Sequence, residues 1–132
     1  MIDIFNELFT KFDTALTTYD DKISTGSVYT NEPSSYPFAS LEEINNSVHE
    51  ATSDSCDIEN HADVDYEVNI YTQGNLKKSK GDGIAQVVDT LFKSLGFVRI
   101  TRNVFQSQNE TTYRIILRYT GVVSKDNVVY RR

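Results

Sequence analysis

The sequence of 132 residues contains one cysteine, two prolines and no tryptophan. A single cysteine, Cys56, cannot close a disulfide within the chain, which excludes a disulfide-stapled secreted domain. There is no run of about 18 apolar residues, so we expect no membrane-spanning helix. Because the first residues lack a basic segment followed by an apolar core, no secretory signal is predicted. These absences favour a protein that is made and folds in a reducing cytoplasm.

The common motifs of catalysis are also missing. The sequence has no P-loop, no G-x-G-x-x-G and no G-x-S-x-G, which are the patterns that build phosphate cradles and nucleophile elbows. Neither histidine stands in a recognisable nucleophile arrangement. We therefore expect no enzymatic activity and no cofactor.

Side chains capable of binding a metal do gather in one acidic stretch: His49, Asp54, Cys56, Asp57, Glu59, His61 and Asp63. Their spacing matches no zinc or calcium pattern. We expect no metal site in this stretch.

Two stretches have the apolar period of an amphipathic helix. In the first, over about residues 3–18, Asp3 is the expected N-cap and the apolar stripe includes Phe5, Phe9 and Phe12. The second is expected over residues 83–95, with Asp82 as the N-cap and Gly96 as the left-handed residue after the helix. Its stripe consists of Ile84, Val87, Val88, Leu91, Phe92 and Leu95.

Strand patterns surround the second helix. The alternation of Val64–Tyr71 predicts a strand before it, and residues 97–105 and 113–120 predict a hairpin after it, joined by a polar turn at 106–110. A β-α-β crossover would make the strands on either side of the helix parallel. One face of the hairpin is expected to be apolar, and the other to carry Arg99 or Arg102 near Arg114 and Arg118.

Between the first strand and the second helix, the sequence predicts a Gly74–Gly81 connection with Lys77, Lys78 and Lys80 in a solvated loop. Phosphate binding is the alternative for these lysines, but no nucleic-acid motif accompanies them.

The middle of the chain, about residues 20–63, has weak signals because it is dense in polar and acidic residues. Val28-Tyr29 is a candidate short strand. The stretch Phe38–Ile44 fits a strand better than a helical turn, and Asn45–Asp57 is expected to be a long exposed loop. A last strand at about 127–131 is expected either to pair within its own chain or to be donated to a neighbouring subunit.

These elements predict one α+β domain over residues 1–132. It would combine a small mixed or antiparallel sheet with two amphipathic helices, a β-α-β-β unit at about 64–121 and a long irregular acidic region at about 20–63.

The net charge of −6 hides a strong asymmetry along the chain. Residues 1–70 carry fifteen acids and two bases, whereas residues 71–132 carry four acids and eleven bases. One interpretation is that acidic loops and a basic sheet neutralise each other within one fold. The other is that an acidic face of one copy meets a basic face of the next, as head-to-tail rings require.

Several features together carry a family resemblance: the amphipathic first helix, Pro33–Pro37 in an irregular acidic middle, Asp65–Tyr71, the second helix ending in Leu95-Gly96-Phe97, and Tyr113–Gly121. In this succession the chain resembles the tail terminator proteins of long-tailed bacteriophages, also called tail completion or tail-to-head joining proteins. The resemblance covers most of the chain and includes no catalytic motif.

The resemblance implies a virion structural protein that forms a hexameric ring on the head-proximal end of the tail tube and stops tube polymerisation. The expected partners are other copies of the chain, the tail tube protein, a neck or head-closure connector protein and, in a contractile tail, the sheath. Assembly would take place in the host cytoplasm. No membrane and no specific nucleic-acid binding is expected.

The ring hypothesis assigns residues to two kinds of contact. Subunit contacts are expected to use a basic sheet surface facing acids of the neighbour: Arg99, Arg102, Arg114, Arg118, Asp63, Asp65 and Glu67. Contacts with the tube or neck are expected to use the acidic loop: Asn45, Asn46, His49, Glu50, Asp54, Asp57 and Glu59.

Two alternatives stay open at the level of sequence. Another neck component, such as a head-closure or head-tail connector subunit, would share small α+β construction and ring assembly. A small metal-dependent enzyme or nucleic-acid-binding protein would instead use the His49–Asp65 cluster or the Lys77–Lys80 loop, and its phosphate binding would weaken steeply with salt.

Overall fold

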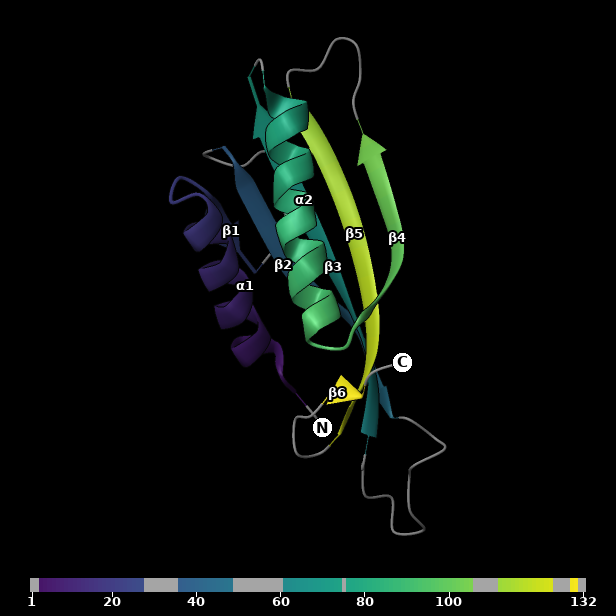
Figure 1. Ribbon diagram of the computed structural model, residues 1–132. Helices are drawn as coiled ribbons and strands as arrows, with labels where there is room; N and C mark the ends of the chain where they lie inside the picture. The colour runs from purple at the N-terminus through teal and green to yellow at the C-terminus, as the bar shows by residue number, and fades with distance from the viewer. Residues whose placement is uncertain are drawn as a thin grey trace, which may run out of the picture.

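The computed structural model describes residues 3–27, 36–48, 61–74, 76–105, 112–124 and 129–130. Over these ranges the α+β class expected from the sequence is confirmed (Figure 1). The elements in chain order are α1 (Phe5–Tyr19), β1 (Ser24–Gly26), β2 (Phe38–Val48), β3 (His61–Gln73), α2 (Lys77–Ser94), β4 (Val98–Phe105), β5 (Thr112–Ser124) and β6 (Val129–Tyr130).

The strands form one mixed sheet in the order β1-β2-β3-β5-β4, and β6 pairs with β5 beyond that path. Among the described strands, the β1–β2 pair is parallel and the other pairs are antiparallel. Figure 1 shows both helices on the same face of the sheet, with α2 in front of β3 and β5 and with β4 at the edge beyond it. The last strand therefore pairs within its own chain, through Val122 and Tyr130.

The expected crossover is present in a split form. Strands β3 and β4, on either side of α2, run parallel because both pair antiparallel with β5. However, β5 lies between them. The hairpin strand thus occupies the centre of the sheet and leaves β4 at its edge.

Helix α2 begins at Lys77, six residues before the predicted start at 83. The prediction that Asp82 caps it is wrong, since Leu76 is the N-cap and makes no side-chain capping bond. Two glycines at 81 and 83 argued against helix in the sequence, because each costs about 1 kcal/mol in a helix. Packing offsets that cost. A Cβ on Gly81 would lie 2.7 Å from Cδ2 of Tyr113 on β5, so the Tyr113 ring requires a residue without a side chain at position 81.

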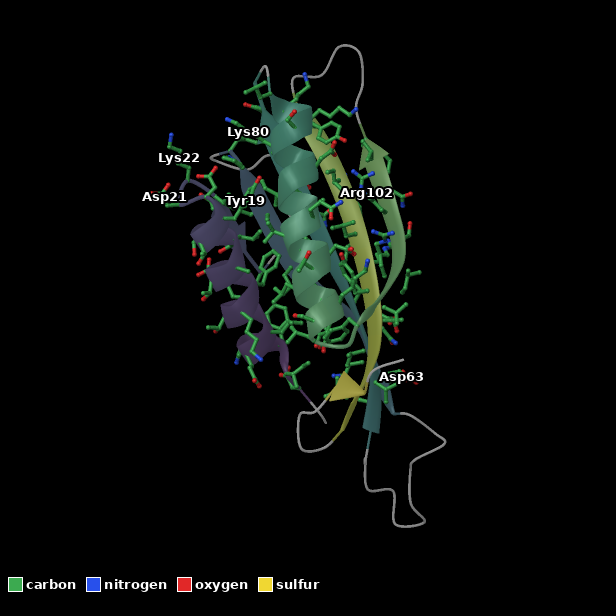
Figure 2. The ribbon with its side chains drawn as sticks, viewed as in Figure 1. Tyr19, Asp21, Lys22, Asp63, Lys80 and Arg102 are labelled. Carbon is green, nitrogen blue, oxygen red and sulfur yellow. The ribbon has the colours of Figure 1, made fainter. Side chains whose placement is uncertain are left out.

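The lysines at 77, 78 and 80 consequently lie in the first turns of α2, and the prediction of a solvated loop for them is wrong. Figure 2 shows Lys80 near the start of this helix. The helix end was predicted correctly, because α2 stops at Ser94 and Gly96 has a φ of 98°.

Helix α1 lies close to its predicted span, but its N-cap is Ile4, so the prediction that Asp3 caps it is wrong. It buries Leu8, Phe12 and Leu16 against the sheet and α2. Asp3 Oδ1 accepts a hydrogen bond of 2.9 Å from the Phe5 N–H, which supplies a partner to the first turn.

An aromatic cluster joins α2 to the sheet at the core. The rings of Phe92 and Tyr119 stack with centroids 4.3 Å apart, and Phe97 meets both Phe92 and Tyr66 edge to face. All four rings are buried. Such pairs add about 0.5–1.5 kcal/mol each beyond the burial of their area.

The irregular middle region is more ordered than the sequence indicated. The predicted strand at 38–44 extends to Val48 and pairs along its length with β3. Asn45 and Asn46 therefore belong to a strand, and their placement in an exposed loop is wrong. Pairing with β3 outweighs the low strand propensity of asparagine. Three predicted features lie outside the described residues: the candidate strand Val28-Tyr29, the turn at 106–110 and the rest of the predicted loop, residues 49–57.

Candidate interaction surfaces

Strand β4 is an exposed edge of the sheet. None of its eight residues is buried, because α2 covers β3 and β5 and stops short of β4 (Figure 1). Its large apolar side chains are 40–55% exposed: Val98, Ile100, Val104 and Phe105. On its outer side, β4 has no partner strand among the described residues. An edge strand with exposed apolar side chains is a surface suited to another protein chain.

The two arginines of β4 turn towards α2. Arg99 Nη1 lies 3.4 Å from Asp89 Oδ1, and Arg102 Nη2 lies 2.9 Å from Asp82 Oδ1. Figure 2 shows Arg102 beside β4. The hypothesis that these arginines share a sheet surface with Arg114 is thus wrong for both of them.

A β-bulge explains the error. The register between β4 and β5 shifts between Arg99 and Thr101, which leaves Ile100 as the extra residue. In a regular strand, residues three apart point to opposite faces. Because of the bulge, Arg99 lies opposite Tyr119 and Arg102 opposite Leu117, both on the helix-covered face.

Asp89 on α2 is the buried centre of a polar cluster whose other members include the exposed side chains of Lys93 and Arg99. Its Oδ1 accepts a 3.0 Å hydrogen bond from the Tyr119 hydroxyl, and its Oδ2 lies 2.9 Å from Lys93 Nζ. Burial opposes ionisation of this carboxyl, but the hydrogen bonds from Lys93 and Tyr119 and the nearby Arg99 outweigh it and lower the pKa of Asp89. Burial, and then the Asp89 charge, raises the pKa of Tyr119.

Asp82 forms a second cluster about two turns earlier on the same helix. Its Oδ1 accepts hydrogen bonds from Arg102 and from the Tyr113 hydroxyl, the latter at 3.0 Å. Burial and this carboxylate together raise the pKa of Tyr113. A small polar cavity lies between the two clusters. Since each acid already faces a base and a tyrosine, these groups act as a clamp that holds β4 to α2.

The other face of the sheet carries the remaining residues of the predicted subunit contact. Asp63, Asp65 and Glu67 alternate along β3 with the buried residues of the core. Arg118, on β5, is opposite Glu67 in the register, and its Nη2 lies 3.5 Å from Glu67 Oε2. The structure therefore brings acids and bases of this group together within one chain. An exposed pair of this kind stabilises the fold by at most about 1 kcal/mol.

Arg114 lies on the same face of β5 and has several partners in its own chain. Its Nη2 donates a 2.9 Å hydrogen bond to Asn69 Oδ1, and its guanidinium carbon lies 5.5 Å from the Tyr71 ring and 5.7 Å from the Phe105 ring. Arg114 thus links the centre of the sheet to the exposed end of β4.

The opposite edge of the sheet is open as well, and the sequence did not reveal it. In the described part of the chain, strand β1 pairs with residues Phe38–Ser40 of β2. From Leu41 to Val48, β2 has no outer partner strand among the described residues. This edge contains Glu42 and Glu43 and an isoleucine at a bulge, Ile44, which is 43% exposed. The signal for this edge that the sequence did contain was the pair of consecutive glutamates, Glu42 and Glu43, between apolar residues.

Glu43 is held on the helix side of this edge. Its Oε1 accepts hydrogen bonds from Asn46 Nδ2 at 3.2 Å and from the Tyr66 hydroxyl at 3.4 Å. Burial raises the pKa of Tyr66, and the Glu43 charge adds to that effect. Glu43 is therefore fixed in position at the end of the sheet farthest from β4.

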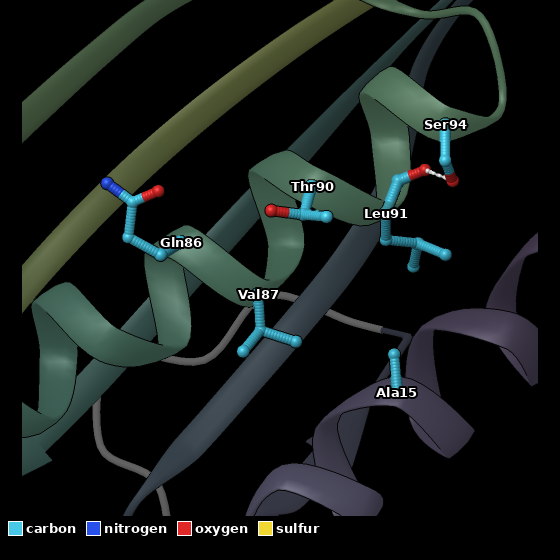
Figure 3. A pocket seen from close by; sticks show the side chains of 6 residues that line it. All are labelled: Ala15, Gln86, Val87, Thr90, Leu91 and Ser94. Carbon is cyan, nitrogen blue, oxygen red and sulfur yellow. Dashed lines mark hydrogen bonds between the residues drawn. The ribbon is translucent and has the colours of Figure 1, made fainter.

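A shallow apolar depression lies between α1 and α2 (Figure 3). Ala15 faces it from α1, and Val87 and Leu91 face it from α2. Its polar neighbour Ser94 donates a 2.7 Å hydrogen bond to the Leu91 carbonyl oxygen (Figure 3). The depression holds no group of titratable side chains.

Of the metal-capable residues singled out in the sequence, only His61 and Asp63 lie in the described part of the chain, at the start of β3. Within that part, no three His, Cys, Asp or Glu residues are placed to hold a metal ion. Across the same ranges, no helix has the length and apolar character needed to cross a membrane.

Comparisons with known proteins assign no family. A scan against protein-family models gives no match to this chain, and a search of curated proteins gives none either. A functional proposal therefore depends on the surfaces of the chain and on the resemblance of its sequence pattern.

Proposed function

We propose that this chain is the tail terminator subunit of a long-tailed phage or of a phage-derived particle. In this role it forms a ring on the head-proximal end of the tail tube, ends tube polymerisation and provides the attachment surface for the neck. The observation that carries the proposal is a small subunit whose sheet has two different open edges among the described residues: β4, which carries Arg99 and Arg102, and β2, which carries Glu42 and Glu43.

Two different complementary edges are what a closed ring needs. Contacts around a ring are head-to-tail, so each subunit must offer one patch to the neighbour on one side and a different patch to the neighbour on the other. A subunit that uses one self-complementary patch forms a dimer and stops. The sequence resemblance to tail terminators supplies the location of the ring, and the two edges supply a way to build it.

The partners in this proposal are further copies of the chain in a hexamer, the tail tube protein, the neck or head-closure connector and, in a contractile tail, the sheath. The predicted contact residues for tube and neck, His49–Glu59, lie outside the described residues, and Asn45 and Asn46 lie on the β2 edge. The function requires no cofactor, since interfaces alone perform it.

Deletion of the gene in the producing strain, followed by electron microscopy of the lysate, tests the proposal. Over-long tubes together with heads detached from tails are the expected result. Tails of normal length beside unjoined heads would move the protein to the neck. Intact particles would reject a structural role in the tail.

A further inference from the structure

We infer that strand β4 of one copy pairs antiparallel with the open stretch of β2 in a second copy, so that one sheet continues from subunit to subunit. The inference deepens the proposed function and rests on it only for closure of the assembly into a ring. The pairing itself is a property of the isolated protein.

Strand β4 lacks most of the features that usually protect a sheet edge. Natural edges are short, contain proline or lysine, or are covered by another element. Strand β4 has eight residues with neither proline nor lysine, neither of the described helices covers it, and its arginines turn towards α2. Its bulge at Ile100 exposes an isoleucine rather than a charge: that side chain is 55% exposed.

The open stretch of β2 is a matching partner. It runs from Leu41 to Val48 and is as long as β4. It also carries a bulge with an exposed isoleucine, Ile44. Two edges of equal length, each with an exposed isoleucine at its bulge, can exchange main-chain hydrogen bonds and cover each other's isoleucines.

The strand directions allow this pairing without turning a subunit over. Each neighbour in the series β2-β3-β5-β4 is antiparallel to the one before it. The first and last strands therefore run in opposite directions. When a second copy continues the sheet with its helices on the same face, its β2 lies antiparallel to β4, which is the more favourable arrangement.

Charge selects this pairing over the two self-pairings. A β4–β4 contact would bring Arg99 and Arg102 of one copy close to those of the other, and a β2–β2 contact would bring together Glu42 and Glu43 of the two copies. Like charges opposite each other on a sheet are destabilising. In the β4–β2 contact, Arg99 and Arg102 share the helix-covered face with Glu43 of the second copy, so opposite charges meet.

Two edge variants distinguish the β4–β2 pairing from the β4–β4 and β2–β2 self-pairings. Val104→Asp places an acid on β4, where it meets the glutamates of a second copy, and leaves β2 intact. Ile44→Lys places a base on β2, where it meets the arginines of a second copy, and leaves β4 intact. Both side chains are exposed in the subunit, so neither change should unfold it. Leu76→Asp is the matched control, because Leu76 is 63% exposed at the start of α2 and lies on neither edge.

Light scattering coupled to size-exclusion chromatography gives the readout. The unmodified protein and Leu76→Asp should elute as assemblies of the 15.0 kDa subunit, whereas each edge variant alone should be a monomer with unchanged circular dichroism. An equimolar mixture of the two edge variants should associate again, because β4 of one meets the intact β2 of the other. Association of Ile44→Lys or Val104→Asp alone would overturn the pairing, and so would an unmodified protein that is monomeric at every concentration.

The same variants distinguish failure of the pairing from failure of the function. If Val104→Asp restores normal tails to the deletion strain, the strand pairing is wrong while the terminator role stands. If the pairing holds in solution and the deletion strain produces intact particles, the role is wrong while the interface stands.

Discussion

Strands β5 and β4 are neighbours with similar apolar content, but their apolar side chains differ in solvent exposure. On β5, Tyr113, Ile115, Leu117 and Tyr119 are at most 2% exposed beneath α2. One strand farther out, the apolar residues of β4 are 40–55% exposed. Both strands carry large apolar side chains, so what differs is their position: β5 lies inside the sheet beneath α2, and β4 lies at its edge (Figure 1). Apolar strands therefore divide here into one that stabilises the fold and one that is available for association.

The largest loss of stability is expected from a substitution in the core beneath α2. Phe92→Ala removes the α2 ring that stacks on Tyr119 and meets Phe97. The lost burial and the cavity left behind should lower the free energy of unfolding by about 3–5 kcal/mol. Urea denaturation followed by circular dichroism measures this loss.

Phe105→Ala on β4 is the matched control. Its ring is 50% exposed and contacts the Arg114 guanidinium, so its removal should cost less than about 1 kcal/mol. Equal losses for the two phenylalanines would contradict the division between a covered and an available strand.

A second change, of intermediate size, concerns the end of β5. A Cβ on Gly121 would lie 2.6 Å from Cδ1 of the buried Phe97 ring. Gly121→Ala should therefore displace that ring and cost about 1–3 kcal/mol in the same denaturation measurement. Thr120→Ala, one residue earlier on the open face, should change stability little. A neutral Gly121→Ala would show that the aromatic cluster is loosely packed.

The clamp that holds β4 to α2 predicts that the stability of the fold depends on pH. Because the pKa of Asp89 is lowered in the fold, its ionised form stabilises the protein at pH values above the ordinary carboxyl value of 3.8. That contribution is lost as the pH falls through the lowered pKa. Asp89→Asn also weakens the hydrogen bonds to Lys93 and Tyr119, and should cost about 1–3 kcal/mol at pH 7.

Urea denaturation at neutral pH and at several values below pH 4 checks this prediction. The difference in stability between the unmodified protein and Asp89→Asn should shrink as the pH falls. Asp21→Asn, at an exposed position, serves as the control and should show no such convergence. A constant difference for Asp89→Asn would mean that its charge does not stabilise the clamp.

Much of the covered region was predictable from local patterns. The stripes on both helices, the stop at Gly96 and the alternation on β3 and β5 are determined by burial on one face, which the residue period records. The start of α2 was not predictable, because packing of Gly81 against Tyr113 offsets the glycine cost. Nor was the central position of β5, which depends on pairing between distant segments.

The candidate surface was harder to predict than the fold. The side on which Arg99 and Arg102 lie depends on one bulge at Ile100, and a shift of one residue reverses the face of a side chain. The open edge at β2 depends on how short β1 is. The charges of Glu42 and Glu43 were visible in the sequence, but their position on an edge follows only from the assembled sheet.

The most direct test of the account is complementation of the deletion strain with Val104→Asp and, in parallel, with Leu76→Asp, followed by measurement of tail lengths by electron microscopy. The account predicts over-long tubes and unattached heads with Val104→Asp, and tails of normal length joined to heads with Leu76→Asp. Normal joined tails from both variants would contradict the claim that the β4 edge builds the terminating ring.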